Sequence, residues 1–129
     1  MAPKIMVIDD ERYMRELMRL HLEMAGYEVL LALDAVVGGR FLLKGYRPDV
    51  IVVDIEMPHM TGLEFIKAVK SDAATSSVPI IVVSSRDDAE AEARELGAAE
   101  FLAKPVRADA LLGTVAKYVD GRVPLDVRG

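Results

Sequence analysis

The sequence predicts an α/β fold in which helices cover both faces of a parallel sheet of five strands. Short apolar segments alternate five times with segments whose apolar residues have helical spacing. This alternation is typical of doubly wound parallel sheets. Three of the apolar segments, at 5–8, 50–53 and 79–83, contain no polar residue. Such continuous segments are expected of parallel strands that are covered on both faces.

The predicted strands are residues 5–8, 28–31, 50–53, 80–83 and 100–102. The predicted helices follow the strands in turn. The first helix carries an apolar stripe that ends before Gly26 and consists of Met14, Leu17, Met18, Leu22 and Ala25. The third helix is predicted from the spacing of Leu63, Ile66 and Val69, and the second, fourth and fifth are predicted at 35–44, 87–96 and 108–119.

The second predicted helix contains Gly38 and Gly39, each of which costs about 1 kcal/mol relative to alanine within a helix. We therefore expect this helix to be the least stable. No linker or internal repeat interrupts the alternation, so residues 1–119 are predicted to form one domain. Residues 120–129 combine glycine, proline and charge and are predicted to form a loose C-terminal tail.

The composition narrows the possible functions. The chain has 129 residues, of which 52% are hydrophobic and 29% charged, as in a soluble globular domain. It has no cysteine, its opening residues lack the apolar stretch expected of a signal peptide, and no apolar segment reaches the roughly 20 residues that span a bilayer. We therefore expect a cytoplasmic protein with no membrane contact. The net charge of −5 and the scattered basic residues argue against direct binding to nucleic acid.

Reactive side chains follow four of the five predicted strands. Ligands in open α/β sheets bind beyond the carboxyl ends of the strands. The first strand is followed by two carboxylates, the third by one, the fourth by two hydroxyls and the fifth by an ammonium; these residues are Asp9, Asp10, Asp54, Ser84, Ser85 and Lys104. We therefore expect all of these groups to lie at one edge of the sheet.

Three neighbouring carboxylates need compensation for their charge. Two unit charges 4 Å apart repel by about 4 kcal/mol at an effective dielectric constant of 20. Such a cluster either holds protons or binds a hard cation, and Mg²⁺ prefers oxygen ligands of this kind. Lys104 then pairs with an incoming phosphate as a point charge. A carboxylate nucleophile, a metal ion and a cation together indicate an aspartyl-phosphate site.

These residues resemble the receiver domains of response regulators, in particular those of the chemotaxis type, in two-component signal transduction. The resemblance covers residues 4–118. The matching residues, in chain order, are the acidic pair Asp9-Asp10, the segment 54–58 (Asp-Ile-Glu-Met-Pro), Gly62, Ser84, Phe101 and Lys104-Pro105. The resemblance implies a flavodoxin-like sheet with strand order 2-1-3-4-5. It also implies a phosphoprotein that catalyses only its own phosphorylation and dephosphorylation.

The resemblance assigns a role to each group at the site. Asp54 is the phosphoacceptor and takes its phosphoryl group from a phosphohistidine of a histidine kinase or a histidine phosphotransfer protein. Mg²⁺ is held by Asp10, by Asp54, by the backbone carbonyl of Glu56, and by Asp9 mainly through water. Lys104 neutralises charge on the phosphoryl group.

The resemblance also implies a conformational switch. Ser84 hydrogen-bonds the phosphoryl group, the amide of Ser85 contacts it, and Phe101 turns inward. The face formed by the fourth helix, fifth strand and fifth helix then changes toward a downstream protein target. The family usually has Thr at Ser84, Ala at Ser85 and often Asp at Thr61, but none of these differences removes a reacting group. We expect a monomer or a weak phosphorylation-dependent dimer.

A separate hypothesis concerns the lifetime of the phosphorylated state. Glu56 lies two residues after Asp54, and Arg86 lies two residues after Ser84, so both are expected at the rim of the pocket. A pair between these opposite charges would hinder an attacking water, although exposed pairs contribute only about 0–1 kcal/mol. Glu56 and Arg86 are thus predicted to act as a gate.

Other interpretations of the same residues stay open at this point. Asp9 and Asp10 also suit the start of a helix, Ser84 and Ser85 suit a cap of the fourth helix, and Phe101 suits static core packing. Two other functions are a Mg²⁺-dependent phosphohydrolase with Asp54 as nucleophile and a pseudo-receiver that only binds a partner. The first requires a second acidic residue and a substrate pocket. The second is favoured by loss of the acidic pair or the lysine.

Overall fold

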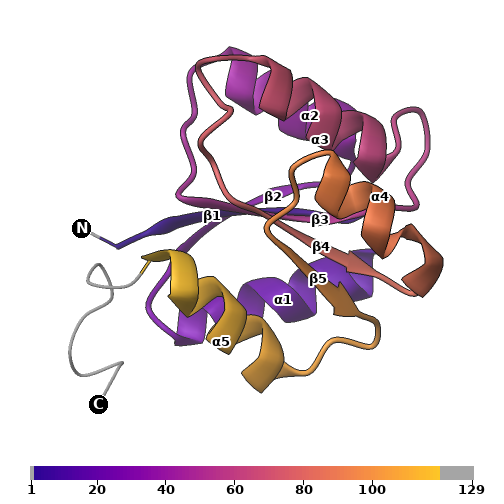
Figure 1. The fold of residues 1–129 in the computed structure, drawn as a ribbon. Coiled ribbons are helices and arrows are strands. Elements are labelled where there is room, and N and C mark those ends of the chain that lie inside the picture. The colour runs from indigo at the N-terminus through magenta and orange to yellow at the C-terminus, as the bar shows by residue number, and fades with distance from the viewer. Residues whose placement is uncertain (1, 120–129) are drawn as a thin grey trace.

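Five parallel strands form one sheet in the order β2-β1-β3-β4-β5 in the computed structural model, which describes residues 2–119 (Figure 1). The strands are β1 (Lys4–Ile8), β2 (Glu28–Ala32), β3 (Val50–Asp54), β4 (Ile80–Ser84) and β5 (Glu100–Ala103). This confirms the predicted fold and strand order. The predicted tail at 120–129 lies outside the described residues. Within residues 2–119, no helix has the length and apolar character needed to cross a membrane.

The helices are α1 (Arg12–Met24), α2 (Ala35–Leu43), α3 (Gly62–Ser71), α4 (Glu90–Glu95) and α5 (Ala108–Val119). The prediction of a single fourth helix over 87–96 was wrong in part, because Asp87–Ala89 forms a 3₁₀ turn and only Glu90–Glu95 is α-helical. Neither element has a side-chain cap for its first amides. Uncapped first turns often tighten into 3₁₀ geometry.

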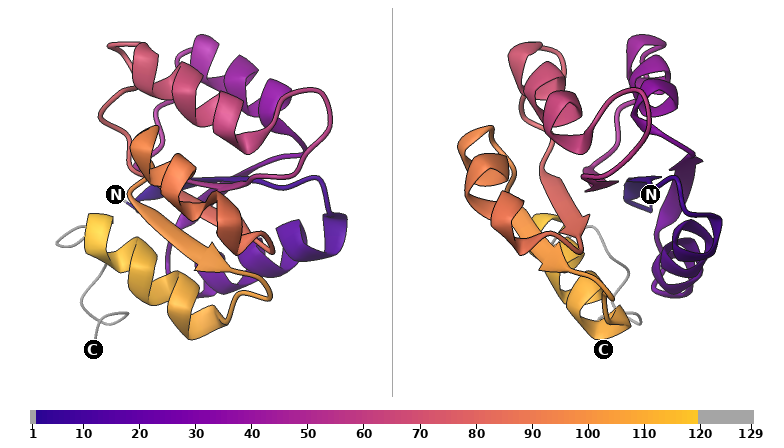
Figure 2. Two further views of the ribbon diagram at one scale, coloured as in Figure 1. Left: turned by 45° about the vertical axis from the view of Figure 1, so that its right-hand side comes forward. Right: turned by 90° about the vertical axis from the view of Figure 1, so that its right-hand side faces the viewer.

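The sheet lies between two helical layers, with α2, α3 and α4 on one face and α1 and α5 on the other (Figures 1 and 2). Alternate side chains of each strand enter the two layers. The core beneath α2, α3 and α4 includes Met6, Ile8, Ile51, Val53, Ile80 and Val82. The core beneath α1 and α5 includes Ile5, Val7, Val50, Val52, Ile81 and Val83. The central strands are therefore apolar at every position except at their ends, because both of their faces are buried.

Two adjacent glycines of α2 have different surroundings. The helix starts at Asp34, whose side chain accepts a hydrogen bond from the amide of Val37 at 2.9 Å. A Cβ atom added at Gly38 would lie 2.6 Å from Cδ1 of Ile8, whereas one added at Gly39 would meet no atom within 4 Å. Close packing against β1 therefore accounts for Gly38 but not for Gly39. The lower stability of α2 relative to the other helices stays a prediction.

We predict that Gly39→Ala raises the free energy of unfolding by about 1 kcal/mol, because alanine favours the helix and its methyl group meets no other atom. Gly38→Ala should raise it less or lower it, because its methyl group displaces Ile8. Urea denaturation of dilute protein measures both changes. Equal stabilisation by the two substitutions would contradict this account of α2.

Candidate functional site

The register of the sheet brings three carboxylates together. Asp54 is the last residue of β3, and Asp9 directly follows β1. Because Ile8 of β1 pairs with Val53 of β3, Asp9 and Asp54 lie side by side at the carboxyl ends of adjacent strands. Asp10 contributes a third carboxylate, and one oxygen from each of the three lies within 4.8 Å of the others. The structure thus brings together the acidic residues singled out in the sequence.

Asp9 is fully buried, and its two carboxylate oxygens have different surroundings. Oδ1 accepts a hydrogen bond from the amide of Glu11 at 2.9 Å. Oδ2 lies 3.2 Å from the ammonium of Lys104 but accepts no well-directed hydrogen bond. The cap position of α1 is Glu11, which makes no side-chain capping bond. A capping role alone therefore does not account for Asp9, because its second oxygen faces the other site residues.

Lys104 connects the carboxylates across the sheet. Its Nζ lies 3.2 Å from an oxygen of Asp9 and 3.2 Å from an oxygen of Asp54, and it donates a hydrogen bond to Asp54. Its amide donates to the carbonyl of Ser84 at 2.9 Å, and its peptide bond to Pro105 is cis. Only 17% of its side chain is exposed. Lys104 is therefore part of the site and is not a solvated surface lysine.

Burial and neighbouring charges shift the pKa values of both partners. Burial is the largest effect on the pKa of Asp54 and raises it, the charge of Lys104 lowers it by less, and the charge of Asp9 raises it again, so this pKa lies above its ordinary value. Burial lowers the pKa of Lys104, but the charges of Asp9 and Asp54 outweigh this effect and leave that pKa above its ordinary value. Lys104 is therefore protonated at neutral pH. The ionised form of Asp54 lowers the free energy of unfolding, because its pKa is higher in the folded protein than in the unfolded chain.

The donor set suits a hard divalent cation. Three carboxylates face a single ammonium, so two negative charges are not compensated within the site. All of the candidate ligand atoms are oxygens, and Oδ2 of the buried Asp9 has the ammonium of Lys104 at 3.2 Å but no well-directed hydrogen bond. Buried oxygens normally have a partner, and Mg²⁺ binds carboxylate oxygens together with water. The residues present therefore fit a Mg²⁺ ion.

Ser84 is buried at the end of β4 and is 1% exposed. Its hydroxyl accepts a hydrogen bond from the amide of Arg86 at 3.0 Å. The N-cap residue of the 3₁₀ turn is Arg86 and that of α4 is Ala89, and neither element has a side-chain capping hydrogen bond. The alternative that Ser84 and Ser85 cap the fourth helix was therefore wrong. Ser85 is exposed beside the site.

Phe101 lies on β5, opposite Val82 of β4 in the register of the sheet. Its side chain is partly buried and packs against the core beneath α2, α3 and α4. In this structure the ring therefore packs on the face of the sheet that α4 covers. Both the switching role and the static role stay predictions.

Glu56 and Arg86 both lie at the site, but they do not form an ion pair with each other within residues 2–119. The amide of Glu56 donates to Oδ1 of Asp54 at 3.3 Å, and its side chain is exposed. The guanidinium of Arg86 instead pairs with Asp88 at 3.3 Å. This hydrogen bond and the charge of Asp88 raise the pKa of Arg86, and Glu56 adds a smaller electrostatic contribution. The gate would require Arg86 to leave Asp88.

Two further residues support the site. Arg15, which the sequence analysis missed, donates from Nη1 to the backbone carbonyl of Asp9 at 2.8 Å. Nothing in the sequence separates Arg15 from Arg12 or Arg19 in the same helix. Gly62 begins α3 and donates its amide to the carbonyl of Ile55 at 2.8 Å. A Cβ there would lie 2.7 Å from Cα of Ile55, so a larger residue would displace the backbone beside Asp54.

Residues 5–116 match the model of the response regulator receiver domain family. The chain belongs to this family. The similarity extends to "Protein PilG" of Pseudomonas aeruginosa, which is 32% identical and matches over 95% of this chain and 92% of PilG. "Response regulator MprA" of Mycobacterium sp. (strain KMS) is 37% identical over 87% of this chain but only 48% of its own length, so the chain spans about half of that relative.

Solved structures agree with this assignment. The chemotaxis response regulator CheY4 of Vibrio cholerae aligns with a TM-score of 0.84 and 32% identity, covering 92% of this chain and 99% of CheY4. The prediction of a two-component receiver domain is confirmed. Receiver domains are signalling modules and not enzymes with a free substrate, so the phosphohydrolase and pseudo-receiver interpretations are not favoured.

We predict that Asp54→Asn stabilises the receiver domain in metal-free buffer at neutral pH by about 1 kcal/mol or more, because it removes a buried charge that folding disfavours. The folded-state pKa of Asp54 is raised, so its penalty is present at neutral pH and fades as the pH falls through that pKa. The gain should therefore disappear below about pH 3.9, the ordinary pKa of aspartate.

Denaturation at neutral and acid pH measures this gain. Glu95→Gln, which neutralises an exposed carboxylate of α4, is the matched control and should change stability little. A loss of stability in Asp54→Asn at neutral pH would contradict the electrostatic account of the site.

Proposed function

We propose that this receiver domain accepts a phosphoryl group on the carboxylate of Asp54 from a phosphohistidine of a histidine kinase or a phosphotransfer protein in the cytoplasm. The observation that supports this most strongly is the position of Lys104, whose ammonium lies 3.2 Å from oxygens of both Asp9 and Asp54. The arrangement provides a nucleophile, a fixed cation beside it and a set of oxygens for a metal ion. These are the parts that phosphoryl transfer requires.

The transfer exchanges one bond for another. An oxygen of Asp54 attacks phosphorus, the bond between phosphorus and the imidazole nitrogen breaks, and that nitrogen keeps the bonding electron pair. The product is an acyl phosphate on Asp54. Lys104 neutralises part of the phosphoryl charge, and Asp9, Asp10, Asp54 and the carbonyl of Glu56 would hold Mg²⁺. When bound, Mg²⁺ supplies charge compensation and orients the phosphoryl oxygens.

The same site is proposed to control the signalling face. In the structure the Ser84 hydroxyl accepts from the Arg86 amide, so this hydroxyl is free to donate its hydrogen to a phosphoryl oxygen. Movement of Ser84 and an amide contact from Ser85 would shift the loop that leads into α4. Phe101, which packs on the α4 side of the sheet, would then turn inward and change the α4-β5-α5 face for a downstream protein.

Two structural observations weigh against the alternative functions. A pseudo-receiver would be expected to lack the acidic pair or the lysine, whereas here both are present and Lys104 contacts Asp9 of the pair and Asp54. A phosphohydrolase needs a substrate pocket at its nucleophile. The pocket between α2 and α3 does not serve Asp54 in this way, because none of the proposed catalytic or metal-binding residues lines it.

We predict that acetyl phosphate and Mg²⁺ add one phosphoryl group to the protein and that Asp54→Ala abolishes this addition. Intact-mass spectrometry measures the gain. Lys104→Met should reduce the extent of phosphorylation at least tenfold, because the phosphoryl charge loses its fixed cation. An unmodified wild-type protein in the presence of donor and Mg²⁺ would overturn the proposed function.

Metal dependence is tested in the same reaction. Chelation of Mg²⁺ should prevent phosphorylation, and Asp10→Asn should require much more Mg²⁺ to reach the same extent. Glu95→Gln serves again as the control, because it removes one carboxylate far from the cluster in sequence and leaves the proposed ligands intact. Full phosphorylation of wild-type protein in chelator would exclude the proposed role of the metal.

The gate hypothesis makes a separate prediction about lifetime. Glu56→Ala and Arg86→Ala should each shorten the half-life of the acyl phosphate, by a few-fold at most because both side chains are exposed. Decay of the phosphorylated mass after removal of the donor measures this.

Asp88→Asn is an informative comparison, since it releases Arg86 from its present partner. If Arg86 then pairs with Glu56, the half-life should lengthen. Unchanged decay in both Glu56→Ala and Arg86→Ala would rule out the gate.

A further inference from the structure

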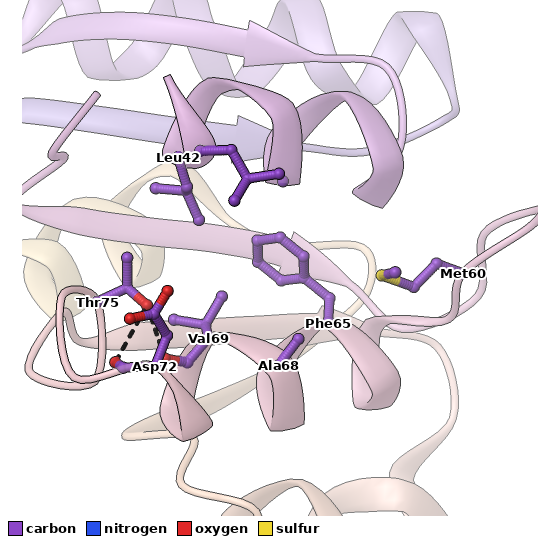
Figure 3. Close-up of a pocket in the computed structure, with 9 residues that line it drawn as sticks. Leu42, Met60, Phe65, Ala68, Val69, Asp72 and Thr75 are labelled. Atoms are coloured by element: carbon purple, nitrogen blue, oxygen red, sulfur yellow. Dashed lines mark hydrogen bonds between the residues drawn. The ribbon is translucent and has the colours of Figure 1, made fainter. Parts of the chain in front are cut away.

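An exposed leucine stands beside a hollow on the side of the sheet that carries α2 and α3. Leu43, in the last turn of α2, is 84% exposed. It also lines a pocket of about 280 Å³ between α2 and α3. Figure 3 shows Leu42 of α2 on one side of this pocket, with Phe65, Ala68 and Val69 of α3 on the other. A projecting apolar side chain and an apolar hollow thus adjoin on one surface.

The pocket has the character of a site for an apolar side chain. Its polar residues, Thr75 and Asp72, lie at one end (Figure 3). The hydroxyl of Thr75 donates to the carbonyl of Val69 at 2.8 Å, and Oδ1 of Asp72 accepts from the amide of Ala74 at 2.9 Å. Sites for small molecules are also mostly apolar, but they offer a few polar groups that fix the orientation of the ligand. Here both polar side chains already bond the backbone of this chain, and the other lining residues are apolar, which favours an apolar side chain from a protein.

Gly39 contributes to this hollow. Packing against Ile8 accounts for the neighbouring Gly38, but a Cβ at Gly39 would meet no atom within 4 Å. A glycine there costs about 1 kcal/mol of helix stability with no compensating contact inside the molecule. Gly39 lines the pocket. Its missing side chain therefore leaves room on the α2 wall for an atom from another molecule.

The charges beside the pocket are complementary to one another. Arg40 is exposed and lies one turn before Leu43 on the surface of α2. Asp72, at the end of α3, is exposed on the pocket's other wall. Neither side chain pairs with an opposite charge within residues 2–119. A two-fold axis places the same patch on both partners, so each Arg40 would approach the other copy's Asp72.

We propose that the α2–α3 surface binds a second copy of this chain, with Leu43 of each copy inserted in the other's pocket beside Gly39. The contact involves one helix face and one pocket, which places it among small and weak interfaces. It does not involve Asp54 and requires no phosphorylation, so it stands apart from the proposed function.

Sedimentation velocity over a range of concentrations, without phosphodonor, tests the proposal. Wild-type protein should form dimers, and Leu43→Ser should weaken association at least tenfold because each inserted leucine is lost. Leu20→Ser is the matched control: Leu20 is a 51% exposed leucine on α1, on the other side of the sheet. A wild-type protein that remains monomeric, or association lost in Leu20→Ser instead, overturns the proposal.

A second variant distinguishes insertion of Leu43 into the pocket from non-specific association of apolar surfaces. Gly39→Leu fills the pocket and adds apolar surface, and leucine favours the helix more than glycine does. Insertion of Leu43 predicts weaker association in this variant, whereas a merely apolar patch predicts stronger association. Reversed charges add a third comparison: Arg40→Asp and Asp72→Arg should each weaken the dimer, and the double variant should recover it.

Cross-linking tests the contact directly, because the chain has no cysteine of its own. A mixture of Leu43→Cys and Ala68→Cys proteins should form a disulfide-linked heterodimer under mild oxidation. A mixture of Leu20→Cys and Ala68→Cys proteins should not. Equal cross-linking in both mixtures would show random collision and overturn the proposed contact.

Discussion

The site depends on one ammonium group held between two buried carboxylates. Lys104 approaches both Asp9 and Asp54 to 3.2 Å, although the three residues come from distant parts of the chain. Each is delivered by the carboxyl end of a different strand of one parallel sheet. The charges of this site are not fully neutralised, because within residues 2–119 the third carboxylate, Asp10, forms no ion pair with a cationic side chain. A site of this kind is electrostatically unsatisfied until a cation joins it.

The apolar core makes this unfavourable arrangement possible. The central strands β1, β3 and β4 are buried on both faces, so their ends cannot separate to relieve repulsion. Local contacts add to this rigidity. Arg15 holds the carbonyl of Asp9, and Gly62 lets α3 start directly against the backbone of Ile55. A well-packed sheet thus stores electrostatic strain at its edge, as functional sites commonly do.

The two faces of the sheet have different surfaces. The α2–α3 side carries a hollow lined by side chains of both helices, beside the strongly exposed Leu43. The adjacent glycines Gly38 and Gly39 of α2 have different structural explanations. The first is needed because β1 approaches closely, while the second faces open space. The residues at the carboxyl ends of the strands and the residues of the apolar α2 surface are therefore two separate sets.

The sequence alone determined the sheet and the chemical content of its edge. Continuous apolar segments require burial on both faces, and the carboxyl ends of parallel strands meet at one edge, so the positions of Asp54 and Lys104 followed from order along the chain. Only the tertiary structure decided the contacts of individual side chains. The pairing of Arg86 with Asp88, the anchoring of Asp9 by Arg15 and the 3₁₀ turn before α4 all depend on distances between atoms. Periodicity records which residues are buried, but it carries no information about such distances.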